Sequence, residues 1–146
     1  MKTVRQSVLI WYSPHEMFEL VRAFERYPEF LPWCDHAKLL SDDASGTVAE
    51  MGIAFAGIKQ RFTTHNAQVA DSEIRMGLVQ GPFSQLTGTW TFSPVGEGTQ
   101  RACRVELVMQ YAFGNRVLAS LVGPVFDRIA ATLVDAFVER ANKVYG

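Results

Sequence analysis

Residues 115–142 read NRVLASLVGPVFDRIAATLVDAFVERAN, and no other segment constrains the architecture as strongly. Apolar residues recur here every three or four positions, which predicts one long helix with a continuous apolar stripe made of Leu118, Leu121, Val122, Val125, Phe126, Ile129, Leu133, Phe137 and Ala141. At 1.5 Å per residue the helix is about 40 Å long. It needs one large apolar partner surface, and the concave face of a curved antiparallel sheet would provide it. We expect a hollow between the two, and function in that hollow.

Short strands precede this helix along most of the chain. Their composition and turn signals predict strands at residues 3–12, 33–41, 47–55, 60–70, 73–79, 84–92 and 102–111. The turns between consecutive strands are short, which favours an antiparallel meander because parallel pairing would need long crossovers. In two of the strands the apolar residues that alternate to one face are Leu86, Trp90 and Phe92, then Val105, Leu107, Met109 and Tyr111.

One short helix interrupts the strands near the N-terminus. Ser13 can cap it, Pro14 suits its first position and Glu16 completes a capping box, so we expect a helix over residues 14–24. Pro28 and Pro32 then bracket residues 29–31, which leaves room for one helical turn.

Composition indicates one globular domain over residues 1–146. The net charge of −1 and the pI near 6.3 argue against general nucleic-acid binding, although a local basic patch is compatible with them. The apolar run in residues 1–12 is too short for a signal peptide or a spanning helix. Cys34 and Cys103 therefore read as reduced thiols of a cytoplasmic protein.

Motifs for catalysis or metal binding are missing. The chain has no phosphate-binding glycine loop, no nucleophile elbow and no His-Glu-x-x-His. Residues 34–36 (CDH) lack the second ligand pair that a structural zinc site needs, and His15 reads as a solvated helix-start residue. His65 lies mid-strand: facing inward it would bond a ligand carbonyl, facing outward it is an ordinary surface residue. Asp127 and Arg128 interrupt the helical stripe and are expected on its solvated side. We predict no catalytic residue and no metal.

Apolar residues outside the expected core mark candidate contact surfaces. Residues 117–126 carry no charge and include Gly123-Pro124, which predicts a kink or a break of the helix. The segment is either a fully buried half-helix or a mobile lip of the hollow that touches a bilayer. A second candidate is the expected loop at residues 77–83, with Leu78 and Phe83 exposed. The predicted rim comprises Leu78, Val79, Pro82, Leu118, Leu121 and Val122.

Three sequence segments, in this order along the chain, are typical of one family: YPEFLPWC at 27–34, GPFSQLTGTWTF at 81–92 and DAFVERA at 135–141. Together they resemble the coenzyme Q-binding branch of the START-like superfamily, whose bacterial members include ribosome association toxins and proteins labelled polyketide cyclase or lipid transport. The resemblance implies an α+β helix-grip fold, in which a curved seven-stranded antiparallel sheet wraps the C-terminal helix around a hydrophobic tunnel. We expect the tunnel wall to include Phe30, Trp33, Met51, Phe55, Phe83, Leu86, Trp90, Met109, Phe126, Ile129 and Leu133.

Three functions follow from this resemblance. The leading one is non-enzymatic binding of a polyprenyl quinone (ubiquinone) or similar lipid, held as a ligand without any cofactor and delivered for respiration by transient contact with the inner membrane. Burying about ten tail carbons at about 0.8 kcal/mol each gives roughly 8 kcal/mol, which is near micromolar affinity before ordering costs. The second is ribosomal subunit binding, for which the available cations are Arg22, Arg26, Lys38, Lys59 and Arg61. The third is an aromatic polyketide cyclase, which lacks an evident acid–base pair.

Overall fold

The computed structural model describes residues 1–146 and contains seven strands and three helical segments. The strands are β1 (Lys2–Ile10), β2 (Cys34–Asp43), β3 (Gly46–Phe55), β4 (Ile58–Val69), β5 (Glu73–Gln80), β6 (Phe83–Pro94) and β7 (Cys103–Phe113). The helical segments are α1 (Pro14–Arg22), the 3-10 helix η1 (Phe24–Glu29) and α2 (Arg116–Tyr145). Every predicted strand and both predicted helices are present, with ends within three residues of their expected positions.

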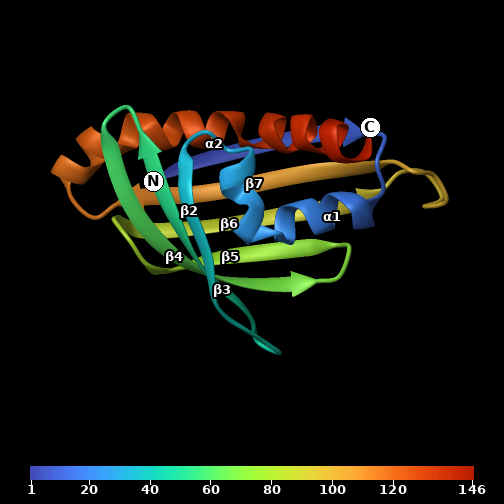
Figure 1. Ribbon diagram of the computed structural model, residues 1–146, viewed down its shortest axis with the longest axis horizontal. Coiled ribbons are helices and arrows are strands. Elements are labelled where there is room, and N and C mark those ends of the chain that lie inside the picture. The colour runs from blue at the N-terminus through green and yellow to red at the C-terminus, as the bar shows by residue number, and fades with distance from the viewer.

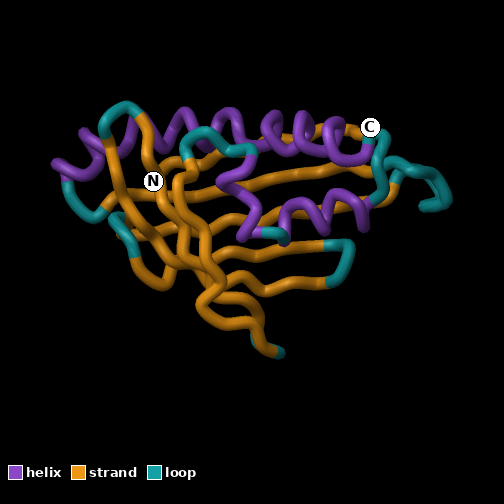
Figure 2. Tube along the Cα trace, in the orientation of Figure 1, coloured by secondary structure: helices purple, strands orange, loops and turns teal.

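The strands form one antiparallel sheet in the order β1-β7-β6-β5-β4-β3-β2. Only β1 departs from a simple meander, since it pairs with β7 and so brings the N-terminus beside the last strand. Figure 1 shows α2 running the length of the molecule next to β1 and β7. The same helix also contacts β4, which lies on the far side of the sheet, so the sheet curves around it. Both helices therefore share the concave face, as the tube in Figure 2 makes clear. This is the predicted helix-grip arrangement.

The long helix α2 is held by its apolar stripe. Asn115 caps it by accepting a hydrogen bond from the Leu118 N–H at 2.9 Å. The helix is unbroken through Gly123-Pro124, so the expected break is not observed. Gly123 is buried beside Phe113, and this packing holds the turn where proline removes a hydrogen bond. Val122 was expected at the rim, but it is 1% exposed and belongs to the interior. It follows the exposed Leu121 in sequence, and one step along the helix turns the side chain from the surface to the core.

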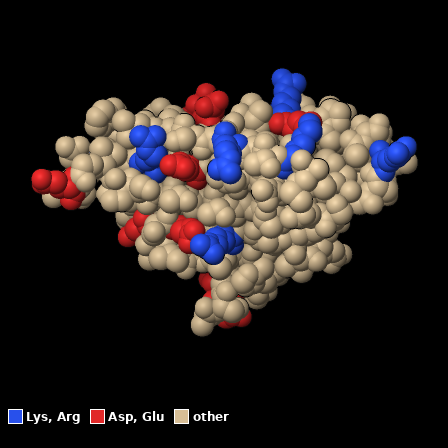
Figure 3. Space-filling model, turned by 180° about the vertical axis from the view of Figure 1, so that it is seen from behind, with Lys and Arg blue, Asp and Glu red and all other residues tan.

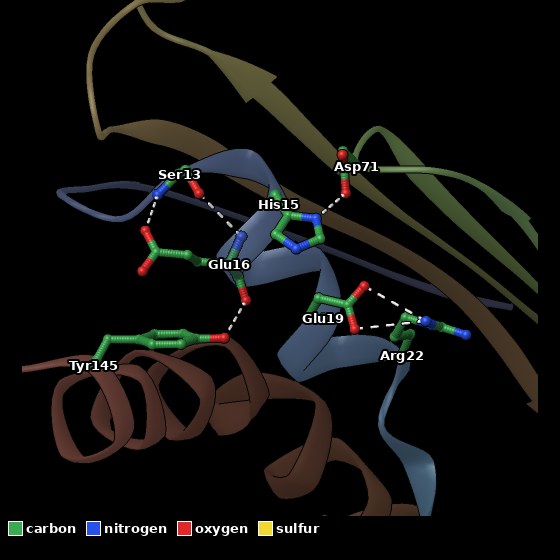
Figure 4. Close-up of polar contacts among 7 residues, drawn as sticks. All are labelled: Ser13, His15, Glu16, Glu19, Arg22, Asp71 and Tyr145. Atoms are coloured by element: carbon green, nitrogen blue, oxygen red, sulfur yellow. Dashed lines mark hydrogen bonds and ion pairs between the residues drawn. The ribbon is translucent and has the colours of Figure 1, made fainter.

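A polar cluster fixes the start of α1 (Figure 4). The Ser13 hydroxyl accepts from the Glu16 N–H at 3.1 Å, and the Glu16 carboxylate accepts from the Ser13 N–H at 2.9 Å, which is the predicted capping box. The Tyr145 hydroxyl donates to the Glu16 carbonyl at 2.9 Å and so ties the end of α2 to α1. His15 was expected to be a solvated residue without a partner. Its ring instead forms a hydrogen bond with Asp71 in the β4–β5 turn at 2.6 Å, and this contact raises the pKa of His15.

The connection from α1 to β2 differs from the prediction. The helical turn expected at residues 29–31 lies earlier, at residues 24–29, and includes Pro28. Its position is set by burial, because Phe24 and Tyr27 are both interior and the Tyr27 hydroxyl donates to the carbonyl of Val21 in α1. This short helix places two aromatic rings at one end of the concave face.

Candidate functional site

A narrow apolar cavity lies between the concave face of the sheet and α2. Its volume is about 60 Å³, which leaves room for roughly four to six water molecules. Thirteen of its fourteen wall residues are hydrophobic: Phe24, Tyr27, Trp33, Met51, Phe62, Met76, Leu86, Trp90, Met109, Phe126, Ile129, Leu133 and Phe137, with Thr64 as the exception. The hollow predicted from the sequence therefore exists, but it is small.

The floor of the cavity is built by strand alternation. Leu86, Gly88 and Trp90 of β6 all face inward. Gly88 lies directly opposite Met76 of β5 on one side and Met109 of β7 on the other. A glycine inside a strand weakens it and often marks a close approach of another group. Here the two methionine side chains cover the backbone at Gly88, and methionine adapts its shape more readily than branched residues do.

Thr64 is the one polar residue of the wall, since the hydroxyl of the other candidate, Tyr27, is bonded to the Val21 carbonyl. Thr64 of β4 is 3% exposed, and its Oγ1 accepts from the side-chain amide of Asn66 at 3.1 Å. Asn66 is fully buried, and its amide also donates to the Thr47 carbonyl at 3.1 Å. A buried polar side chain must be bonded in this way, because leaving it unpaired is costly. The hydroxyl of Thr64 still has acceptor capacity for a ligand.

Two aromatic clusters contribute to the cavity wall. In one cluster the Phe137 ring lies 5.4 Å from Tyr27 and 5.2 Å from Trp90, in edge-to-face contacts. In the other cluster Phe83 contacts Phe126 at 4.9 Å and Phe62 at 5.8 Å. A ligand longer than the cavity must displace one of these clusters or pass through another part of the wall.

Eight of the eleven residues predicted for the tunnel lie on the cavity wall, namely Trp33, Met51, Leu86, Trp90, Met109, Phe126, Ile129 and Leu133. Their contact with a ligand remains a prediction. The other three do not line it. Phe30 packs on the outer side of Phe137 at 5.2 Å, and Phe83 lies behind Phe126. Phe55 lies near the β3–β4 turn and lines a separate outer pocket.

Six wall residues escaped the sequence prediction: Phe24, Tyr27, Phe62, Thr64, Met76 and Phe137. Phe137 was already part of the helical stripe, and period-two alternation in β4 would have placed Phe62 with Thr64. Met76 gives no such signal, because its inward position depends on the pairing register of β5 with β6.

The predicted rim gathers at one end of the molecule, where the β5–β6 turn meets the start of α2 (Figure 1). The Gly114 N–H donates to the Pro82 carbonyl at 3.1 Å and joins the two segments. Val79 and Leu121 are 57% and 56% exposed, while Leu78, Pro82 and Leu118 are half-buried. Residues 77–83 belong largely to β5 and β6, so the expected loop is wrong, and Phe83 is buried because it faces α2.

Titratable groups are placed away from the cavity or are already bonded. His65 does not line the cavity, because it alternates with the inward-facing Thr64. Burial raises the pKa of Tyr27 well above its usual value, so this wall residue stays a neutral phenol. No acid–base pair faces the enclosed space.

Asp127 of α2 is only partly solvated, whereas its neighbour Arg128 is exposed as expected. Asp127 accepts a hydrogen bond from the Tyr111 hydroxyl at 2.6 Å and pairs with Lys2. Burial opposes ionisation of Asp127, but the bonds from Lys2 and Tyr111 outweigh it and lower the pKa of the carboxyl. Through these bonds Asp127 links β7 and β1 to α2. Both cysteines are free and buried, and burial raises the pKa of each thiol to about 11.

Comparison with known proteins places this geometry in a family. The ribosome association toxin RatA of Pseudomonas aeruginosa is 38% identical over 143 residues, which cover 98% of this chain and 97% of the toxin. The mitochondrial coenzyme Q-binding protein COQ10 homolog B of Xenopus laevis is 26% identical over 142 residues, covering 97% of this chain and 58% of that protein. A START superfamily protein from Mycobacterium smegmatis superposes with a TM-score of 0.81 at 19% identity, covering 97% of this chain and 98% of that one, which shows the shared fold. The family described as polyketide cyclase / dehydrase and lipid transport matches residues 10–138. The chain belongs to that family.

Proposed function

We propose that this chain binds a hydrophobic small molecule between its sheet and α2, and that the ligand is a lipid with a long tail such as a polyprenyl quinone. The observation that carries the proposal is the cavity wall, where thirteen of fourteen residues are apolar. Such a wall recognises a tail by burial, at about 0.8 kcal/mol for each CH₂, while one neutral hydrogen bond would add only about 1 kcal/mol. The relationship to a coenzyme Q-binding protein supports a quinone as the specific ligand.

Because the cavity is small, binding of a long-tailed lipid requires it to expand. A chain of more than a few carbons cannot enter unless the wall moves. Met51, Met76 and Met109 supply three flexible side chains on the sheet side of the cavity, and methionine repacks at little cost. A bound tail would therefore require an expandable site, with a wider separation of α2 from β5 and β6.

A role in carriage rather than catalysis fits the same wall. No acid–base pair faces the cavity, and the Tyr27 hydroxyl is already bonded to a carbonyl. The exposed apolar residues at the rim, Val79 and Leu121, would contact a bilayer while a lipid exchanges. We place the protein in the cytoplasm with peripheral contact at the inner membrane. By composition and length α2 could cross a membrane, but ten of its residues pack inside this fold.

The experiment is extraction of the purified protein with organic solvent, followed by mass spectrometry of the extract. A quinone or related lipid in near-stoichiometric amount supports the proposal. An unrelated protein purified in the same way controls for carried-over membrane. Repeatedly empty extracts, together with no saturable binding of added quinone, would contradict it.

A second candidate, association with a ribosomal subunit, is favoured by the identity of 37–39% to several ribosome association toxins across nearly the whole chain. The distribution of surface charge does not by itself indicate ribosome binding. Of the five cations considered from the sequence, all but Lys38 have a carboxylate within 4 Å. Figure 3 shows basic and acidic side chains interspersed on the face in view, without a purely basic patch.

Co-sedimentation with purified ribosomal subunits tests the second candidate. Phosphate contacts would make binding fall steeply between about 50 and 200 mM salt. Because most cations are paired, we expect a shallower salt dependence, which would indicate contacts with ribosomal protein as well as with RNA. An absence of co-sedimentation at low salt would dismiss this candidate and leave the lipid proposal intact.

A further inference from the structure

A second pocket lies directly outside the cavity wall. It has a volume of about 190 Å³ and opens between α2 and the end of β3. Trp33 and Ile129 belong to both walls, so their side chains form the partition between the two spaces. Trp33 is half-exposed, and its carbonyl accepts from the Ala54 N–H at 2.8 Å, which fixes its backbone to β3.

The outer pocket has one charged wall residue, Arg128. Its guanidinium lies over the Phe55 ring, 5.5 Å from the centroid, a contact that restrains the plane of the guanidinium. The neighbouring Thr132 adds a hydroxyl, which donates to the Arg128 carbonyl at 2.9 Å. The remaining wall is apolar, as in the cavity behind it.

Arg128 is free to bind, unlike most arginines of this chain. Six arginines, at positions 22, 26, 61, 75, 101 and 140, have a carboxylate within 4 Å. Arg128 has none, and its side chain makes no hydrogen bond within the protein. The adjacent carboxylate of Asp127 is bonded to Tyr111 and Lys2 instead, so it does not compete for Arg128.

We propose that the outer pocket is the head-group site of the ligand whose tail occupies the cavity, with Arg128 as the residue that binds the head. This inference rests on the proposed lipid-binding function. The guanidinium presents N–H donors in a planar fork that matches two neighbouring acceptor oxygens. Such a pair occurs as a ring carbonyl beside an ether oxygen in a ubiquinone, or as the two oxygens of a fatty acid carboxylate.

The positions of the two spaces set the direction of binding, because the outer pocket lies on the surface side of the partition, beside the exposed Arg128. A substituted ring is too large for the 60 Å³ of the cavity, but a single alkyl chain needs only that the partition of Trp33 and Ile129 and the methionine floor give way. The tail therefore enters first and the head stays outside, where Arg128 and the Trp33 ring meet it. The same order leaves the head accessible from solvent or from a membrane surface.

Binding of three probes to Arg128→Gln tests this assignment. The probes are a ubiquinone with a tail of about ten carbons, a fatty acid of matching length and a hydrocarbon of the same length without oxygen. Arg116→Gln is the matched control, because Arg116 is exposed, unpaired and on the same helix but lines none of these pockets. Thermal unfolding of each variant verifies folding.

We expect Arg128→Gln to weaken binding of the oxygenated probe whose head group matches that of the natural ligand, by about tenfold or more. Binding of the hydrocarbon should not change. Loss for the quinone but not for the fatty acid identifies a neutral ring, and the reverse identifies a carboxylate. Unchanged binding of both oxygenated probes overturns the head-group site while lipid binding stands. Equal weakening of all three probes also overturns it, because Arg128 then acts only through structure. If the wild-type protein binds none of the probes, the lipid proposal itself fails.

Discussion

The terminal methyl group of Met76 occupies the space that a side chain at Gly88 would need. A Cβ built on Gly88 would lie 2.5 Å from Met76 Cε, so even alanine at this position must push the methionine aside. The backbone at Gly88 is ordinary strand, and the obstacle is the flexible end of one side chain. Ligand capacity and protein stability can therefore be separated at this residue.

Gly88→Ala and Gly88→Val are expected to fill the floor of the cavity in two steps. Stability should change by no more than about 1 kcal/mol for alanine, because the new methyl group displaces a mobile neighbour while the strand loses a glycine. Quinone binding should weaken with each added carbon. Gly77→Ala in β5 is the control, since a Cβ there meets nothing within 4 Å. Undiminished binding to Gly88→Val would place the ligand elsewhere.

The aromatic contacts of Phe137, including that with Trp90, should contribute most to the packing of α2 against the rest of the fold. Phe137 is 1% exposed and touches three other rings. We expect Phe137→Ala to lower the free energy of unfolding by about 3–5 kcal/mol in denaturant titrations. Val144→Ala, on an exposed position of the same helix, should cost little. A loss below about 1 kcal/mol for Phe137→Ala would mean that α2 is held by other contacts.

Acid should loosen the start of α1. The Arg101 guanidinium bonds the Glu16 carboxylate and, with the Ser13 cap, lowers the pKa of Glu16 from 4.5 to about 2. A carboxyl whose pKa is lower in the folded than in the unfolded state stabilises the fold above the unfolded pKa. That stability is lost as the pH falls from about 4.5 through 2.

Arg101→Gln should therefore reduce the loss of stability across that pH window, and only modestly because the Arg101 side chain is largely exposed to solvent. Unfolding measured as a function of pH gives the comparison. Arg104→Gln, which removes a surface arginine without a carboxylate partner, should follow the wild-type curve. Parallel curves for Arg101→Gln and wild type would show that the ion pair does not hold the pKa down.

Membrane contact should depend on the rim. Leu121→Ser is expected to reduce co-sedimentation with liposomes several-fold, because Leu121 is 56% exposed in the first part of α2, at the end of the molecule where the β5–β6 turn meets this helix. Leu40→Ser provides the control, since Leu40 is 49% exposed on β2, away from that end. If both variants lose binding equally, or neither does, the rim is not the membrane-facing surface.

The fold could be predicted because its signals are local and repeated. The stripe of α2, the alternation of β6 and β7 and the Ser13–Glu16 capping box each follow from spacing along the chain. The cavity wall was only partly predictable, because Met76 and Phe62 reach it through the pairing of β4, β5 and β6. Asp127 shows the same limit: its partners Lys2 and Tyr111 lie far away in sequence, so its burial depends on tertiary packing. Arg128 carries no sequence signal beyond a charge in an apolar stripe.

Tryptophan fluorescence tests most directly whether a lipid enters the space between the sheet and α2. Trp33 and Trp90 line the cavity, whereas Trp11 is 70% exposed, so Trp11→Phe leaves only the two reporters in the wall. Titration of this variant with a quinone should give saturable quenching at micromolar concentration or below, and Gly88→Val in the same background should weaken it. Quenching that is linear and unsaturable, and equal in both proteins, would mean that no ligand occupies the cavity.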